Sequence, residues 1–221
     1  MENTTQLPQS SLADDMSFAV AVGVSGGQVN VTDSEKKRWF IAIVAHNTEK
    51  ACCRKLIELF SLDGGDFPDF ETYVPSQREL RIWRNGRRKK VDRILIPTFL
   101  FIRCTETTRK TIKSRAAFIK SFMKDRAGQT DAFGMYPFAF IPDRQMLDLQ
   151  RMVGDAETPV TIDPRRLHVG AKVRVKGGRL KGLEGNILRE PGGGTSLVLG
   201  IHILGYAKVE MPLDMLESIE K

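Results

Sequence analysis

Four glycines lie within nine residues of a basic segment near the C-terminus, and two kinds of chemistry could use them. The segment VRVKGGRLKGLEGNILRE covers residues 173–190, with glycines at Gly177, Gly178, Gly182 and Gly185. A phosphate-binding loop of the form G-x-x-x-x-G-K-[ST] leads into a helix, as does the dinucleotide motif G-x-G-x-x-G. No Lys-Ser or Lys-Thr pair and no helical pattern follows here. A small β barrel explains the glycines better, because it needs tight turns and close backbone approach.

The other chemistry-bearing residues form no catalytic or metal-binding pattern. His46, His168 and His202 are isolated from one another in the sequence, and no Cys/His spacing is typical of a zinc site. Cys52 and Cys53 fit small core residues better than nucleophiles, and no Ser/His/Asp or paired-carboxylate arrangement is visible. We therefore predict that the chain is not an enzyme and needs neither a cofactor nor a metal.

The basic charge is concentrated in the middle of the chain. The net charge is +7, and residues 37–154 alone hold 23 Lys/Arg against 13 Asp/Glu, whereas residues 1–36 hold one Lys and five acids. A basic region of this kind indicates a nucleic acid or an acidic protein partner, or simply a solvated surface. No apolar run reaches the ~18 residues of a membrane span, and three cysteines make no disulfide framework. We expect a cytoplasmic protein without membrane contact.

Hydrophobic periodicity divides the chain into four parts. Residues 1–36 have no sustained pattern and are predicted to be a mobile tail. Residues 37–154 predict alternating strands and helices, with a hairpin at Asn85-Gly86, and so an α+β antiparallel sheet with packed helices. Residues 155–166, rich in proline, acid and threonine, predict a linker. Residues 167–221 predict only short strands separated by glycine turns, which is typical of a small all-β barrel.

Two regions resemble parts of one protein family. The pattern V-x-V-x-x-G-x-x-x-G-x-x-G-x-I resembles the KOW motif, with Gly178 and Gly182 in its turns and Gly185 at its signature position. The succession RWFIAIVAHNTEKACCRKL, YVPSQ, a basic hairpin and ILIPTFLFIR resembles the NusG N-terminal (NGN) domain. The resemblance therefore implies an NGN domain followed by an SH3-like KOW barrel, as in NusG-type transcription elongation factors.

In that family, the sheet next to the proline of ILIPTFLFIR docks on the clamp helices of RNA polymerase. Phe99 and Phe101 fall on one face of their strand, so they are either docking residues or core residues. The predicted docking residues are Ile43, Ile96, Pro97, Phe99 and Phe101. The family has Gly or Asn at the position of Thr98 and Tyr at that of Phe99. The segment Thr108, Arg109, Lys110 and Thr111 loosely resembles one that meets the polymerase gate loop, although a Thr-capped helix start explains it equally well.

Two groups of residues are candidates for binding non-template DNA or nascent RNA. The hairpin tip carries five cations, which either displace counterions from phosphates or blunt the edge of the hairpin: Arg84, Arg87, Arg88, Lys89 and Lys90. The second group lies at the start of the first helix, where the helix dipole favours anions, although an ordinary capped surface helix is the alternative: His46, Asn47, Lys50 and Arg54. Trp83 either stacks on a base or packs on the sheet.

These observations predict a monomeric elongation or antitermination factor whose KOW barrel binds a second partner, such as a ribosomal protein or a termination factor. The acidic N-terminus and the W-F…E-K…L opening are most similar to UpxY-type members, which antiterminate capsular polysaccharide operons. The alternative is a KOW-containing RNA-binding or ribosome-associated protein. The first predicts preferential binding to polymerase, and the second predicts preferential binding to free RNA with a steep salt dependence.

Overall fold

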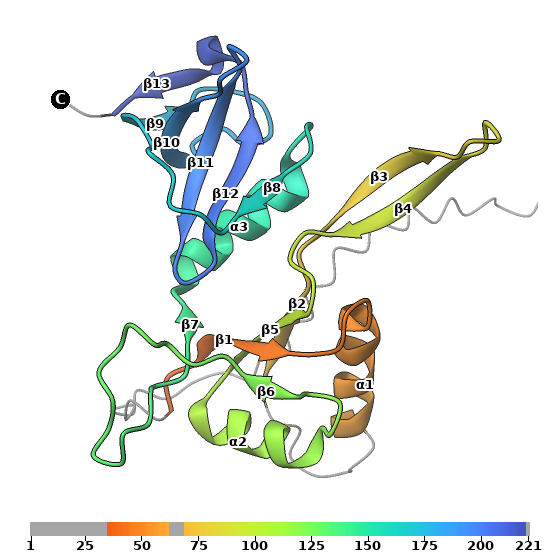
Figure 1. Cartoon of the computed structure of the whole chain (residues 1–221), viewed down its shortest axis with the longest axis vertical. Helices are drawn as coiled ribbons and strands as arrows, with labels where there is room; N and C mark the ends of the chain where they lie inside the picture. The colour runs from red at the N-terminus through yellow and green to blue at the C-terminus, as the bar shows by residue number, and fades with distance from the viewer. Residues whose placement is uncertain (1–34, 62–68, 220–221) are drawn as a thin grey trace, which may run out of the picture.

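The computed structural model describes residues 35–61 and 69–219, which form two main sheets and a projecting hairpin. Figure 1 shows the first sheet with helices α1 and α2 in its lower half, the second sheet above, and the hairpin extending to one side. Apart from Glu35 and Lys36, the predicted N-terminal tail lies outside the described residues.

The first sheet is antiparallel, with the strand order β2-β5-β1-β6 and with β7 also paired to β1. The central pair runs in register from Arg38↔Cys104 to Ile43↔Phe99. Because the hydrophobic run from Trp39 to Val44 is β-branched and aromatic, it suits a strand with both faces covered. The strands are β1 Arg38–Ile43, β2 Glu71–Tyr73, β5 Phe99–Cys104, β6 Ser121–Phe122 and β7 Phe140–Ile141.

Helices α1 (Glu49–Ser61) and α2 (Glu106–Arg115) cover one face of this sheet. Alternate residues of the central strands point toward these helices, as the period of two requires. Leu100 and Ile102 of β5 are fully buried in one apolar cluster with Leu56 of α1 and Ile112 of α2.

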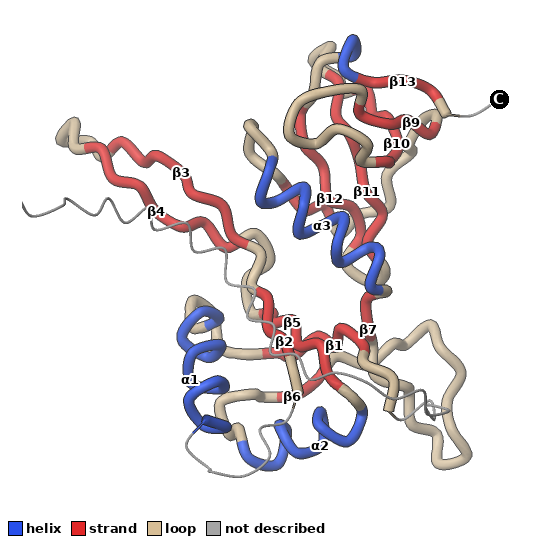
Figure 2. The backbone as a smooth tube through the Cα atoms, turned by 180° about the vertical axis from the view of Figure 1, so that it is seen from behind, coloured by secondary structure: helices blue, strands red, loops and turns tan. Residues whose placement is uncertain are grey.

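Helix α3 (Asp143–Asp155) contacts the first sheet through β1 and the second sheet through β11. Its buried residues Met146, Leu149 and Met152 belong to an apolar cluster that includes residues of both sheets. Polar contacts also join the helix to the second sheet: the Gln145 side chain accepts from the His202 amide (2.8 Å), and Arg151 donates to the Lys181 carbonyl. The two sheets are therefore packed together through α3 (Figure 2).

Strands β3 (Ser76–Ile82) and β4 (Arg88–Ile94) form a separate two-stranded hairpin that projects away from both sheets (Figures 1 and 2). The predicted turn at Asn85-Gly86 is confirmed, with Ile82 opposite Arg88 and Gly86 at φ 77°. The base of the hairpin is fixed by Gln77, whose side-chain oxygen accepts from the Val160 amide at 2.7 Å.

The second sheet has the strand order β13-β9-β10-β11-β12-β8. Its strands are β8 Thr161–Asp163, β9 Lys172–Val175, β10 Glu184–Arg189, β11 Thr195–Ile201, β12 Gly205–Glu210 and β13 Leu216–Ser218, with the 3-10 turn η1 Leu213–Met215 before the last. Gly178 and Gly182 have φ of 71° and 83°, which glycine adopts without steric cost. At Gly185 the limit is space, since a Cβ there would lie 2.6 Å from the Val198 carbonyl oxygen.

The predicted fold class, a helix-covered antiparallel sheet followed by a small β region, is confirmed. Two short strands differ from the sequence prediction. β8 lies inside the predicted linker and pairs with β12, while Val160 just before it is fully buried. β13 was also missed, because three residues are too few to show a period of two. Within the described part of the chain, no helix has the length and apolarity needed to cross a membrane.

Gly185→Ala is expected to lower the free energy of unfolding by about 2 kcal/mol, because a methyl group forced against the Val198 carbonyl must displace the β10–β11 pair. Gly192→Ala is the matched control, since nothing lies within 4 Å of its Cβ position. Chemical denaturation of both variants checks this. Equal midpoints would show that the sheet accommodates the methyl group at Gly185.

Candidate functional site

The turn before β5 has a strained backbone that one buried carboxylate stabilises. Thr98 lies in the left-handed region at φ 70°, and so does Asn47, at φ 60°, just before α1. The Glu49 side chain is fully buried, and its Oε1 accepts from the Thr98 amide at 2.6 Å and from the Asn47 amide at 3.3 Å. Glu49 therefore holds the start of α1 against the turn that leads into β5.

This geometry explains why Gly or Asn suits position 98 better than Thr. Thr98→Gly is expected to raise the free energy of unfolding by about 1 kcal/mol, because a β-branched residue at positive φ is strained. Thr107→Gly, at an exposed helical position of α2, should instead lower it by about 0.3 kcal/mol, because glycine is a slightly poorer helix former than threonine. Thermal melts of the two variants give the sign of each change, and a lower melting temperature for Thr98→Gly would contradict the strain argument.

The predicted apolar docking surface is divided by the structure into a core part and a surface part. Phe101 and Ile96 are buried, at 0% and 7% exposure, in the cluster that includes α3. Their prediction as surface contacts is not compatible with this packing, because α3 returns to cover that face of the sheet. Phe99 and Ile43 lie opposite each other at the end of the β1–β5 pair and are half-buried, and Pro97 is exposed. These three residues form the apolar edge.

The predicted gate-loop segment on α2 also has buried and exposed members, and Arg109 is the buried one. Its guanidinium lies 3.5 Å from the centre of the Phe138 ring and near Phe40 and Phe122, and it is paired with Glu106. Its side chain is 5% exposed, so it is not available for the surface contact that the sequence predicts. Lys110 is exposed, Thr108 and Thr111 are half-buried, and the Thr108 amide donates to the N-cap residue Thr105.

At the start of α1, the structure leaves three of the four predicted nucleic-acid residues exposed. His46, Asn47 and Arg54 are exposed, whereas Lys50 is half-buried and its Nζ lies 2.7 Å from Asp92 of β4. That ion pair links α1 to the hairpin. Lys50 therefore has a structural partner, and the other three side chains remain on the surface. Asn47 lies next to the turn that leads into β5, because the amides of Asn47 and Thr98 share the Glu49 carboxylate.

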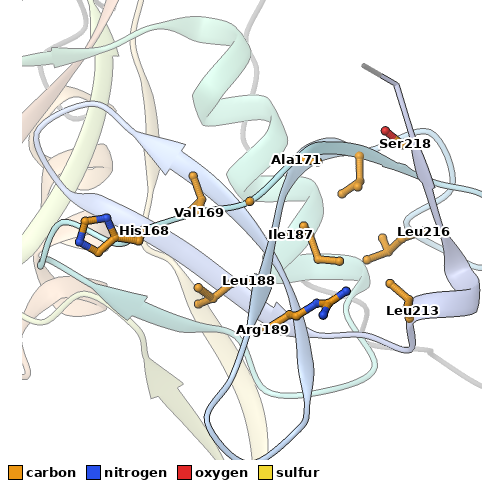
Figure 3. Close-up of a pocket in the computed structure, with 11 residues that line it drawn as sticks. His168, Val169, Ala171, Ile187, Leu188, Arg189, Leu213, Leu216 and Ser218 are labelled. Atoms are coloured by element: carbon orange, nitrogen blue, oxygen red, sulfur yellow. The ribbon is translucent and has the colours of Figure 1, made fainter. Parts of the chain in front are cut away.

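The five cations of the hairpin tip are all exposed, and so is Trp83 at 57%. The alternative that Trp83 packs on a sheet is therefore wrong, because the hairpin projects beyond both sheets. A further candidate is a groove of about 580 Å³ in the second sheet, with His168 and Arg189 among its lining residues. Figure 3 shows the Ile187 and Leu216 side chains pointing toward each other within it.

The His, Cys, Asp and Glu side chains of the described residues are dispersed over the structure. Among them, no three His, Cys, Asp or Glu side chains are grouped so that they could hold a metal ion. Burial raises the pKa of the Cys104 thiol to about 12 and also raises the pKa of Cys53, so both thiols are protonated at neutral pH. These cysteines act as small core residues.

The family model described as transcription termination factor NusG matches residues 37–167, more than half of the chain. The protein belongs to the NusG family. This makes it a transcription elongation or antitermination factor, and NusG-family factors are not enzymes. The matched residues contain the apolar edge, the exposed start of α1 and the basic hairpin.

Two solved structures also match the chain. Thermotoga maritima NusG is 16% identical, with a TM-score of 0.43, and the match covers 85% of this chain and 99% of that one. The MjSpt4:Spt5 complex is 11% identical, with a TM-score of 0.26 and coverage of 83% and 97%. No curated relative matches the sequence. The assignment to the NusG family depends on the family model alone.

Sequence reasoning missed two features of the NusG-family domain. The role of Glu49 depends on the backbone amides of Asn47 and Thr98, which are far apart in the sequence, and no sequence pattern predicts such a contact. The loop between β6 and β7 presents Phe133 at 89% exposure, with the Asp131 side chain accepting from the amides of Phe133 and Met135. An Asp followed by an exposed aromatic and Gly134 is the signal that could have indicated this turn.

Proposed function

We propose that this NusG-family protein binds RNA polymerase through residues 37–154, its NGN domain, and thereby favours processive transcription. The family match carries the proposal, since it covers the sheet in which Phe99, Ile43 and Pro97 form a half-exposed apolar edge. An apolar edge next to exposed polar and basic residues suits a protein partner. Contact with the polymerase clamp helices is assigned to this edge.

A second contact, with the polymerase gate loop, is assigned to the exposed side of α2. Lys110 is exposed and Thr108 and Thr111 are partly accessible, while Arg109 positions the helix from beneath. A protein that contacts both sides of the polymerase cleft binds its closed form more tightly than its open form. It therefore shifts the population toward the closed, processive state without doing any chemistry.

The nucleic-acid contacts are assigned to the surface that continues from the apolar edge. His46, Asn47 and Arg54 lie exposed at the start of α1, and Lys50 connects this helix to the basic hairpin through Asp92. A polymerase-bound protein would thus present cations to non-template DNA or nascent RNA near the docking site.

Residues 167–221 are assigned as the KOW domain, with residues 155–166 as the connection to the NGN domain. The groove that contains Ile187, Leu216 and Arg189 suits an apolar protein segment with an acidic residue, as a ribosomal protein or a termination factor could supply. We further propose a cytoplasmic monomer of the UpxY type, which acts on capsular polysaccharide operons. The acidic N-terminal residues and the W-F…E-K…L opening support this narrower assignment.

A direct affinity comparison tests the proposed function. The full chain should bind core RNA polymerase at least tenfold more tightly than a free RNA of random sequence, and binding should persist at moderate salt because the docking edge is apolar. Binding titrations against both partners at two salt concentrations measure this. Tighter binding to free RNA with a steep salt dependence would instead support the RNA-binding alternative.

A further inference from the structure

The β3–β4 hairpin carries almost the whole net charge of the chain. Residues 76–94 hold eight Lys/Arg and two Asp/Glu, a net charge of +6 in a chain whose total is +7. Both acids lie toward the base and are paired, Asp92 with Lys50 at 2.7 Å and Glu79 with Arg93 at 3.4 Å. Within the described residues, no acid lies within ion-pair distance of the tip cations, namely Arg84, Arg87, Arg88, Lys89 and Lys90.

Trp83 lies among these cations on a backbone that is already fixed. Its amide donates to the Arg87 carbonyl at 2.9 Å, its carbonyl accepts from the Gly86 amide at 2.8 Å, and the Arg87 amide donates to the Asn85 side chain at 3.1 Å. The indole is nevertheless 57% exposed, whereas Trp39 in the first sheet is 5% exposed. An ordered loop thus presents a large aromatic surface to solvent.

The hairpin register shows that both faces near the tip combine apolar and basic groups. Leu80 and Ile82 are exposed and lie opposite Lys90 and Arg88 on one face. Trp83 follows Ile82, so the alternation of a strand directs it to the opposite face. Acidic proteins would match the cations, but a partner that matches both the cations and an exposed indole is a nucleic acid, whose bases and phosphates alternate at short spacing.

We propose that the tip of this hairpin binds an unpaired nucleic-acid strand, with Trp83 stacked on a base and the tip cations in contact with the neighbouring phosphates. The proposal deepens the nucleic-acid contact of the proposed function by naming its form. An unpaired strand is favoured over a duplex because the bases of a duplex already stack on one another and leave the indole no free face. Cations alone would suffice for a duplex backbone.

The test uses the full chain without polymerase, a single-stranded oligothymidylate and a duplex of equal length. The chain has two tryptophans, and Trp83 is the exposed one, so stacking should quench part of the intrinsic fluorescence. Trp83→Ala should weaken single-strand binding about tenfold and abolish the quench, while Trp83→Phe should retain most of the affinity because a ring remains. Phe133→Ala, which removes an exposed aromatic outside the hairpin, should change neither quantity.

Charge is tested separately with the double variant Lys89→Gln, Lys90→Gln. Loss of two phosphate contacts should reduce the slope of log K against log salt by about 1.4 for a single strand. The proposal is overturned if the duplex binds as tightly as the single strand, if Trp83→Ala loses no more affinity than Phe133→Ala, or if the parent shows no quench. None of these outcomes bears on polymerase affinity, so failure here is distinct from failure of the proposed function.

Discussion

Phe99→Ala is expected to weaken binding to core RNA polymerase at least 30-fold, about 2 kcal/mol, with little change in stability. Phe99 is half-buried at the end of β5, beside Ile43 and the exposed Pro97, so its ring can provide an apolar anchor for a partner. Because the ring is already partly solvated, its removal should cost the fold no more than about 1 kcal/mol, well below the cost for a core Phe.

Phe101→Ala supplies the contrast on the same strand. Phe101 is fully buried against the α3 cluster, and Tyr73 lies beside it with ring centres 6.4 Å apart. Its truncation should cost about 3–5 kcal/mol of stability, and any loss of polymerase binding should follow from unfolding. Denaturation curves and polymerase affinities of both variants are needed. Docking through Phe99 would be refuted by a collapsed melt of Phe99→Ala, or by a normal melt with unchanged affinity.

The comparison of Phe99 with Phe101 shows how far the sequence could predict this site. The period of two places both rings on one face of β5, and the fully buried Leu100 and Ile102 on the other face agree with it. Burial of Phe101 depends on α3, which follows about 40 residues later and covers only part of that face. The local sequence pattern therefore predicted the strand and its two faces, but it could not predict that α3 buries Phe101 and leaves Phe99 partly exposed.

Whether other features could be predicted also depended on how far apart in the sequence the interacting residues lie. The Asn85-Gly86 turn follows from local backbone preferences and was predicted correctly. The contacts of the Glu49 carboxylate with the Thr98 amide and of the Arg109 guanidinium with the Phe138 ring were not predicted, because they join residues that only the folded chain brings together. Trp83 is the reverse case, since a large aromatic usually packs in a core, whereas among the described residues Trp83 is 57% exposed on a hairpin that projects beyond both sheets.

Arg109→Ala is expected to lower the free energy of unfolding by about 3 kcal/mol, although arginines in basic segments are usually exposed to solvent. The guanidinium is stacked over Phe138 at 3.5 Å and lies 5.3 Å from the Phe122 ring centre, so its removal leaves a gap beneath the sheet. It also leaves Glu106 without its partner. Because Glu106 is about one-third exposed, water can replace part of that interaction, which keeps the cost toward the lower end for buried pairs.

Lys110→Ala is the matched control, because it removes an exposed cation from the adjacent position of α2 and should leave stability within about 0.5 kcal/mol of the parent. The two variants should therefore have different effects. Lys110→Ala should weaken polymerase binding without lowering the stability of the fold, whereas Arg109→Ala should lower the stability. Arg109→Lys should recover only part of the lost stability, because an ammonium cannot reproduce the planar stack on Phe138 or the two-point contact with Glu106. Urea denaturation of the three variants decides the matter. A parent-like midpoint for Arg109→Ala would contradict the prediction, because it would mean that the aromatic cluster holds α2 in place without the buried cation.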